Sequence, residues 1–269
     1  MKPGKLFLII FLVFFVLIVI LRSCQEDEYI EDNNEQGIIQ PLDSIQDNQS
    51  DYSEDIIEIP NQNPETVIPS EDIIENWPDS IYSSVKGYPF LSDIQKEVII
   101  EVNKCRSNPS RYADEVLEPF LKSMNPNGIF VDSNGKKIKT KEGKPAVKEA
   151  IEALRSQKPC SLLKPQNYLC KGAIDHCKDQ GPDSYVGHGG TDGSSPTDRA
   201  RRYNPKCKGV GENIQYGSSS GKEIVRDLII DDGVASRGHR ENFYEDYVHI
   251  GVGFGTHAGY DYMCVIDFE

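Results

Sequence analysis

The segment from residue 25 to residue 79 sets the limit on what this chain can fold. It contains seventeen Asp and Glu residues and no Lys or Arg, with many Asn, Gln, Ser and Pro residues. Such a segment cannot bury enough apolar surface to offset the entropy lost on ordering, so we expect a disordered acidic linker over residues 25–80. One domain, residues 81–269, is then left to form a hydrophobic core.

The linker also explains the acidic composition of the chain, whose formal net charge is −14. The linker contributes seventeen negative charges and the residues before it contribute three positive ones, so residues 80–269 balance to zero. No basic patch indicates a nucleic-acid partner, and we exclude that class.

An apolar run of sixteen residues, LFLIIFLVFFVLIVIL, occupies residues 6–21. As a helix it would span about 24 Å, slightly less than a bilayer core of about 30 Å. Residues 1–24 fit three interpretations: an uncleaved signal-anchor, a cleaved signal peptide, and a lipoprotein signal ending at Cys24. Each predicts contact with a membrane through this segment and places the remainder on its extracellular side, as a single-pass protein or a secreted one.

Seven cysteines are typical of an oxidising compartment, and disulfides are therefore expected. Cys170 and Cys177 lie two turns apart on one expected helix and are too distant to bridge each other. Sequence does not choose among the possible pairings of the six cysteines in the domain. These six are Cys105, Cys160, Cys170, Cys177, Cys207 and Cys264.

The domain reads as helices first and a β hairpin last, which predicts an α+β class or a three-layer arrangement. A Ser-Asn-Gly turn between two short extended runs predicts a further hairpin or ordered loop within residues 128–145. At the end, HIGVGFG and YDYMCVIDF read as strands joined by a THAG turn. The expected helices cover residues 93–105, 110–121, 145–157, 165–181, 194–204 and 221–232.

Three polar positions lie beside glycine at the edges of expected elements, where a side chain can point into a cleft. They are His188 in YVGHGG, Glu212 in VGENIQYG and His239 in SRGHREN. A fourth feature is the pair Asp231 and Asp232 at the end of an apolar helical run. The helical period places at least one of them on the inward face, where the helix dipole disfavours a carboxylate.

An inward carboxylate at that place needs a donor or a cation, which His239 or a histidine-bound metal would supply. The alternative is a solvated turn with an arginine partner. His176 is expected to be a core or helix-face histidine, and we treat His249 and His257 as structural, although His257 could reach the cleft mouth.

A serine hydrolase is not expected. Ser184, Ser194 and Ser195 are close in sequence to His188, but none lies in a G-x-S-x-G motif. Ser194 and Ser195 are better explained as turn and helix-cap residues.

From about Glu97 to the last residue the chain resembles a CAP domain, also called an SCP domain, of the cysteine-rich secretory, antigen 5 and pathogenesis-related superfamily. The TKEGKPAVKEAIEAL stretch is similar to the microbial and protist branch. Five motifs in this order carry the resemblance: HCKDQG with GHGGTDGSSPTDR, GENIQYG, IIDDGVASRGHREN, HIGVGFGTH and MCVIDF.

The resemblance implies a three-layer α-β-α sandwich with a cleft that holds two histidines and two acids and often binds a divalent metal. His188 takes the place of the first histidine, Glu212 that of the acid in the GEN motif, and His239 that of the second histidine. The second acid is usually Glu. Here Asp231, or alternatively Asp232, fills that position with a side chain one methylene shorter.

Two neutral imidazoles suit Zn²⁺ with open positions for water, so His188 and His239 are possible metal ligands. Such a water could attack a substrate with Glu212 as base, although two histidines are fewer protein ligands than most catalytic zinc sites use. The alternative is that the four residues form a hydrogen-bonded network that braces the cleft.

Three functions follow as hypotheses. The leading one is an extracellular or membrane-tethered CAP module without catalytic activity, which requires no cofactor, possibly holds Zn²⁺, and binds a lipid or sterol or an extracellular protein partner. The second is a metal-dependent hydrolase or peptidase that uses the same cleft. The third is a structural or adhesive surface protein.

Overall fold

The computed structural model describes residues 40–41 and 76–269. The predictions for the apolar run, for Cys24 and for most of the acidic linker lie outside the described residues. Within the described part of the chain, no helix is both long enough and apolar enough to span a bilayer. The fold begins with Trp77, which is buried in the main core and donates its indole N–H to Glu115 at 2.8 Å.

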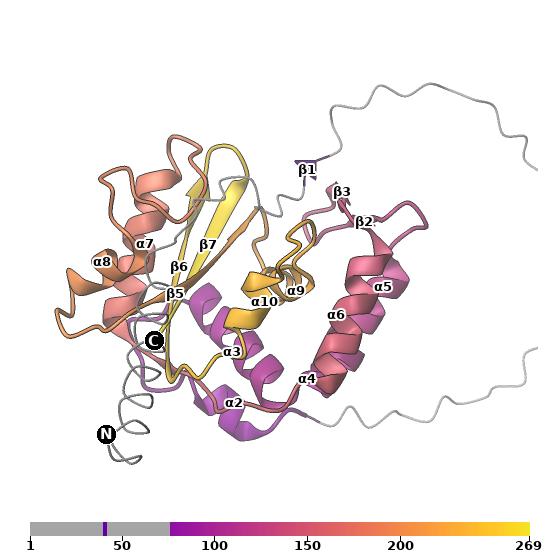
Figure 1. Ribbon diagram of the computed structural model, residues 1–269, viewed down its shortest axis with the longest axis horizontal. Coiled ribbons are helices and arrows are strands. Elements are labelled where there is room, and N and C mark those ends of the chain that lie inside the picture. Colours follow the sequence, from indigo (N-terminus) through magenta and orange to yellow (C-terminus); the bar gives the residue numbers. More distant parts are fainter. Residues whose placement is uncertain (1–39, 42–75) are drawn as a thin grey trace, which may run out of the picture. The chain divides into compact units, whose positions relative to one another are not determined.

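A four-stranded sheet lies between two layers of helices (Figure 1), which confirms the expected three-layer α-β-α class. The strand order is β4-β6-β7-β5, with β6 antiparallel to β7, β7 antiparallel to β5, and β4 parallel to β6. The strands are β4 (Lys164–Pro165), β5 (Gly211–Tyr216), β6 (His249–His257) and β7 (Asp261–Phe268).

The alternation of side chains along β7 explains the layers. Cys264, Ile266 and Phe268 join the main core, which contains α3 (Asp93–Ser107) and α9 (Gly221–Ile230). Met263 and Val265 face the opposite layer and pack with Ala173 and Cys177 of α7 (Asn167–Gln180). Successive side chains of β7 therefore point to opposite helical layers.

Two glycines of β6 allow α7 to lie directly on the sheet. A Cβ atom at Gly251 would overlap with Leu169 and the backbone of Cys170, and one at Gly253 would overlap with the backbone of Ala173. This close packing fixes the height of α7 and of the loop that follows it above the sheet.

Two helices begin at capping boxes. Ser92 and Gln95 cap α3 reciprocally, and Ser195 and Asp198 do the same for α8 (Pro196–Arg201). The expected helix at 110–121 is instead three pieces: α4 (Pro109–Tyr112), the π-helical turn η1 (Ala113–Leu117) and α5 (Glu118–Ser123). The π turn lies just before Pro119, which has no N–H to continue an α-helical ladder.

The expected hairpin within residues 128–145 is also confirmed, as β2 (Ile129–Val131) and β3 (Lys137–Lys139). The short strand β1 (Gln40–Pro41) pairs with the other edge of β3. The remaining helices are α2 (Asp79–Ser83), α6 (Lys144–Ser156) and α10 (Gly238–Asn242).

Three differences from the sequence analysis concern the sheet. The terminal turn is Ala258–Tyr260 rather than THAG, because Thr256 pairs with Tyr262 and His257 pairs with Asp261. Strands β4 and β5 were not expected. β5 lacks a clear apolar–polar alternation because its four central residues are all buried between the two helical layers.

The expected disulfides are absent: all six cysteines of the described part are free thiols. The five buried ones belong to three hydrophobic clusters. Cys105, Cys170 and Cys264 are in the main core, Cys177 is in the core on the other face of the sheet, and Cys207 is in a third cluster.

Candidate functional site

The first histidine and the first acid of the expected tetrad are in direct contact. Glu212 lies on β5 and accepts a hydrogen bond at Oε1 from Nδ1 of His188, at 2.8 Å. The Glu212 side chain is only 2% exposed, whereas that of His188 is 45% exposed. The carboxylate therefore fixes one ring nitrogen of a histidine whose other nitrogen faces outward.

Arg199 of α8 also binds the Glu212 carboxylate. Its Nη2 donates to Oε2 of Glu212 at 2.6 Å, and its Nη1 donates to the backbone carbonyls of His188 and Ser194. The guanidinium is buried with the carboxylate, so the pair is a buried ion pair whose oxygens are both used. Sequence analysis missed Arg199 because its segment reads as an ordinary capped helix.

The loop that carries His188 is held by hydrogen bonds on both sides of the residue. Gln180 donates to the carbonyls of Gly187 and Gly189, and the Gly187 N–H donates to the hydroxyl of Tyr216 on β5. His176 is fully buried, as expected, and its Nε2 contacts the same Gly187 carbonyl at 2.8 Å. The position of His188 is therefore set by α7 and β5 rather than by its own loop sequence.

Two neighbouring buried carboxyl groups of the sheet, Glu212 and Asp267, have pKa values shifted in opposite directions. Burial raises the pKa of Glu212, but the hydrogen bond from His188 and the charge of Arg199 outweigh it and hold the pKa below its ordinary value. Asp267 lies directly opposite Glu212 on β7 and is fully buried. Burial, together with the charge of Glu212, raises the pKa of Asp267 well above its usual range. One carboxyl is thus ionised and its neighbour protonated.

The second acid and the second histidine form another pair. Asp231 caps the C-terminus of α9 in the left-handed conformation, with φ of 56°, and its carboxylate accepts from His239 twice. The backbone N–H of His239 donates at 3.0 Å and its Nδ1 contacts Oδ1 at 2.7 Å. The donor that an inward carboxylate needs at this helix end is therefore His239.

Asp232 has a different role. Its two oxygens accept the backbone N–H groups of Lys141 at 2.5 Å and Glu142 at 2.8 Å, which ties the segment before α6 to the end of α9. Both aspartates are buried, so neither belongs to a solvated turn. At least one inward carboxylate was expected, and both are inward. They point in different directions because α9 ends at Ile230 and Asp231 is in the left-handed conformation.

Strand β5 joins the two histidine–acid pairs. Asn213 follows Glu212 on this strand and donates to the backbone carbonyl of His239 at 2.8 Å. Asn242 of α10 donates to Oδ1 of Asn213 at 2.8 Å and to the carbonyl of Glu212 at 3.4 Å. His188, Glu212, Asp231 and His239 are thereby brought to one region, with each imidazole oriented by its own carboxylate.

Comparison with known proteins places this arrangement in a family. Residues 148–268 match the sequence model of the CAP family, described as the cysteine-rich secretory protein family. This match contains all four residues of the tetrad. Residues 148–268 thus form a CAP domain.

The relatives of this CAP domain cover parts of the chain. An uncharacterised protein, YkwD of Bacillus subtilis, is 29% identical over 111 residues, which are 40% of this chain and 41% of that protein. The chain thus spans about two fifths of the length of the curated relative it matches.

Two solved structures are also similar. An extracellular protein with an SCP domain from Bacillus anthracis has 22% identity and a TM-score of 0.34, over 46% of this chain and 37% of that one. An outer surface protein of Borrelia burgdorferi has 20% identity and a TM-score of 0.34, over 39% of this chain and 75% of that one.

The divalent metal implied by the resemblance to CAP domains has few ligands here. His188 and His239 use Nδ1 for their carboxylates, which leaves only Nε2 of each ring for a metal. Among the described residues, no group of three or more His, Cys, Asp or Glu side chains is placed to hold a metal ion. Two nitrogens do not fit a resident catalytic ion, and we derive no step through one. Binding of exchangeable Zn²⁺ by the two histidines stays a prediction.

The other candidate residues of the CAP domain have structural partners. The Nε2 atom of His257 contacts the carbonyl of Tyr185 at 2.9 Å, and His249 pairs with Glu269 at 3.7 Å. Ser195 is the N-cap of α8. Ser194 is buried, with its carbonyl bound by Arg199.

Proposed function

We propose that the CAP domain is a binding module without catalytic activity, that it works outside the cytoplasm, and that it binds a protein partner at the His188 side of the cleft. One observation carries the proposal: the exposed His188 follows two exposed apolar residues, Tyr185 and Val186, on a loop whose backbone is hydrogen-bonded to α7 and β5. Tyr185 is 55% exposed and Val186 is 42% exposed.

This surface has the features of a recognition site. Gln180 and Tyr216 hold the loop backbone by hydrogen bonds, so little conformational entropy is lost when a partner docks. Tyrosine is enriched at the centres of protein interfaces, where its ring is buried and its hydroxyl is satisfied by the partner. The Nε2 atom of His188 adds a polar group of fixed orientation.

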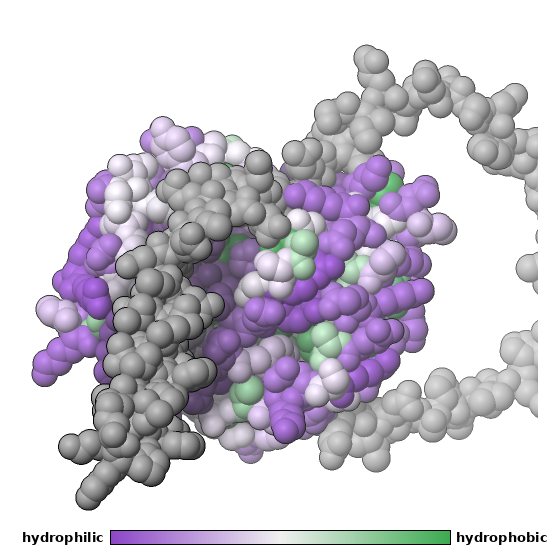
Figure 2. All heavy atoms as spheres, viewed as in Figure 1, coloured by the Kyte–Doolittle hydropathy of each residue, from purple (hydrophilic) through white to green (hydrophobic). Residues whose placement is uncertain are grey.

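The apolar area favours a protein over a lipid or sterol partner. Tyr185 and Val186 are the exposed large apolar side chains of the loop that carries His188. On the face shown in Figure 2, apolar residues form small separate patches among hydrophilic ones. A lipid chain or sterol ring system needs a larger continuous apolar surface to offset its transfer from water.

The position of Glu212 argues against the hydrolase alternative. A general base must reach the proton it removes, but this carboxylate is almost fully buried and both its oxygens are used by His188 and Arg199. The structural or adhesive alternative predicts that the exposed loop is dispensable for any partner.

The experiment places a photo-crosslinking residue, benzoylphenylalanine, at position 186 in cells that produce the protein. The same residue at position 203 is the control, because Tyr203 is 43% exposed and Val186 is 42% exposed. We expect an adduct of discrete mass at 186, none at 203, and loss of the adduct in the His188→Ala background. Absence of an adduct at 186, or peptide hydrolysis that depends on His188, would refute the proposal.

A further inference from the structure

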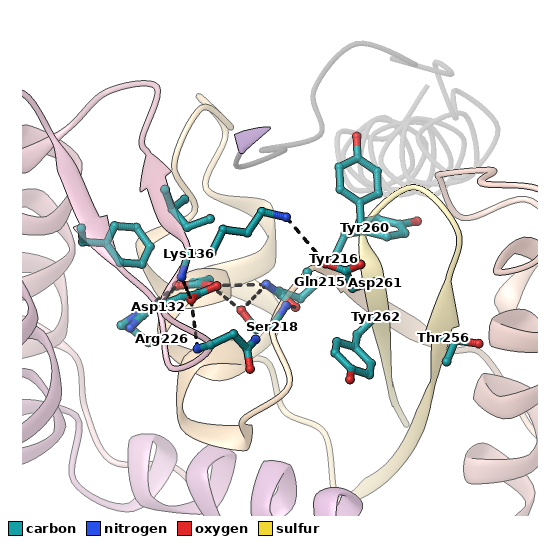
Figure 3. Close-up of a pocket in the computed structure, with 15 residues that line it drawn as sticks. Asp132, Lys136, Gln215, Tyr216, Ser218, Arg226, Thr256, Tyr260, Asp261 and Tyr262 are labelled. Atoms are coloured by element: carbon teal, nitrogen blue, oxygen red, sulfur yellow. Dashed lines mark hydrogen bonds and ion pairs between the residues drawn. The ribbon is translucent and has the colours of Figure 1, made fainter. Parts of the chain in front are cut away.

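A cavity of about 390 Å³ lies at the opposite end of β5 from Glu212. Strand β5 rises about 3.3 Å per residue, so Tyr216 at this end is about 13 Å along the strand from Glu212. The β2–β3 hairpin forms one wall, and the end of the sheet with the β6–β7 turn forms the other (Figure 3). We name it the hairpin pocket. Its volume is in the range of small-molecule sites.

The hairpin pocket is held together by contacts between segments distant in sequence. Ser133 at the hairpin tip donates from its backbone N–H and its hydroxyl to Glu223 of α9, at 3.0 and 2.6 Å. Figure 3 shows Lys136 extending from the hairpin toward Asp261, the first residue of β7, and this ion pair measures 3.6 Å. The two walls are thus joined both below and across the pocket.

The positively charged side chains that line the pocket already form ion pairs. Arg226 pairs with Asp227 at 2.7 Å and lies over the ring of Phe120 at 4.1 Å. Lys136 pairs with Asp261. A phosphate or carboxylate ligand would have to displace one of these carboxylates, so anionic ligands are disfavoured.

The polar groups that remain suit a ligand with several hydroxyl groups. Asp132 uses Oδ1 for the N–H groups of Asn134 and Lys136, while its Oδ2 has no hydrogen-bond partner among the described residues. The hydroxyls of Tyr260 and Tyr262 likewise have no partner within that part of the chain. A free carboxylate oxygen accepts strong hydrogen bonds from ligand hydroxyls, and phenol groups can donate or accept.

The aromatic rings that line the pocket offer apolar contacts to such a ligand. Tyr260, Tyr262 and Phe130 line the same space, and Tyr260 lies 5.5 Å from the ring of Tyr216. The negative face of an aromatic ring attracts the C–H groups on the face of a sugar ring. Aromatic faces beside free acceptors match a molecule with apolar C–H faces and a rim of hydroxyls.

We propose that the hairpin pocket binds a neutral saccharide, with the Tyr260 ring against its C–H face and Asp132 accepting its hydroxyl groups. This site is separate from the histidine cleft and does not depend on the function proposed there.

The test is saturation-transfer-difference NMR on the purified full chain, in a detergent whose headgroup is neither sugar nor amine. The probes are chitotriose, maltotriose and mannotriose as neutral saccharides, sialyllactose as an anionic one, and choline as a cation. We compare the wild type with Tyr260→Ala and with Asp132→Asn, which keeps the Oδ1 acceptor of the hairpin turn. Tyr82→Ala, at an exposed tyrosine on α2, is the matched control.

We expect at least one neutral trisaccharide to show transfer to its ring protons, with sialyllactose weaker through its carboxylate. Each pocket variant should bind about tenfold more weakly, while Tyr82→Ala binds as the wild type does. The proposal is overturned if no neutral trisaccharide binds, if choline binds in their place, or if binding survives in both folded pocket variants. Circular dichroism of each variant confirms folding, and Asp132→Asn keeps the test decisive if Tyr260→Ala unfolds.

Discussion

Asp267 offers a test of the electrostatics under the cleft, because replacing it with Asn should change how stability depends on pH. The side chain is fully buried on β7, and neither carboxyl oxygen has a hydrogen-bond partner among the described residues. Burial, with the charge of Glu212, raises its pKa well above the usual range. The native state therefore holds a proton that the unfolded chain releases.

The sign and size follow from linkage. An unfolded Asp has a pKa of about 3.9, so above that pH the native state binds one more proton than the unfolded state. The contribution of Asp267 to stability is complete below about pH 3.9 and falls by about 1.4 kcal/mol per pH unit as the pH rises toward the native pKa. Asn keeps the shape of the side chain and does not titrate. Asp267→Asn should therefore gain stability relative to the wild type as the pH rises from 5 to 7, at a rate of up to about 1.4 kcal/mol per pH unit.

The assay is urea unfolding at pH 5, 6 and 7 for the wild type, Asp267→Asn and Asp183→Asn. Asp183 is exposed, so its variant controls for the loss of one formal charge. A constant difference in the free energy of unfolding between Asp267→Asn and the wild type at all three pH values would refute the reasoning, because it would mean that Asp267 is ionised in the native state.

Three further predictions concern other groups. Arg199→Met should lower the free energy of unfolding by about 3–5 kcal/mol in urea titrations, because it leaves the buried Glu212 carboxylate without its ion pair; a loss below about 1 kcal/mol would contradict that role. In a Cys24→Ser background, Ellman's reagent should modify Cys160 first and the five buried thiols only after unfolding, and fewer than six thiols in denaturant would indicate a disulfide. Calorimetry should show weak Zn²⁺ binding that His188→Ala/His239→Ala abolishes; retention of binding in the folded double variant would move the metal elsewhere.

Sequence reasoning predicted well wherever the controlling contacts are local. The helix cap at Ser195 was predicted because a cap involves residues only three positions apart. The terminal hairpin was predicted because its two strands are joined by a short turn. His188, Glu212 and His239 were found beside glycines in short motifs, and the aspartate pair at the end of an apolar helical run, with help from the resemblance to CAP domains.

The features that the sequence did not predict are those whose role depends on contacts between segments distant in the chain. Strand β5 is buried on both faces and shows no period, yet it carries Glu212 and joins both histidine–acid pairs through Asn213. Arg199 and Asp267 look like an ordinary helix residue and an ordinary strand residue. Their importance comes from α8 and β7 meeting at β5.

The sequence by itself determined where the long helices and the terminal hairpin lie, because these depend on spacing along the chain. Only the tertiary structure decided that Asp231 serves His239 while Asp232 holds the segment before α6. It also decided that the cysteines stay apart. The reason is that a left-handed residue at a helix end, or the packing of a helix on a distant strand, redirects side chains in ways that no local period records.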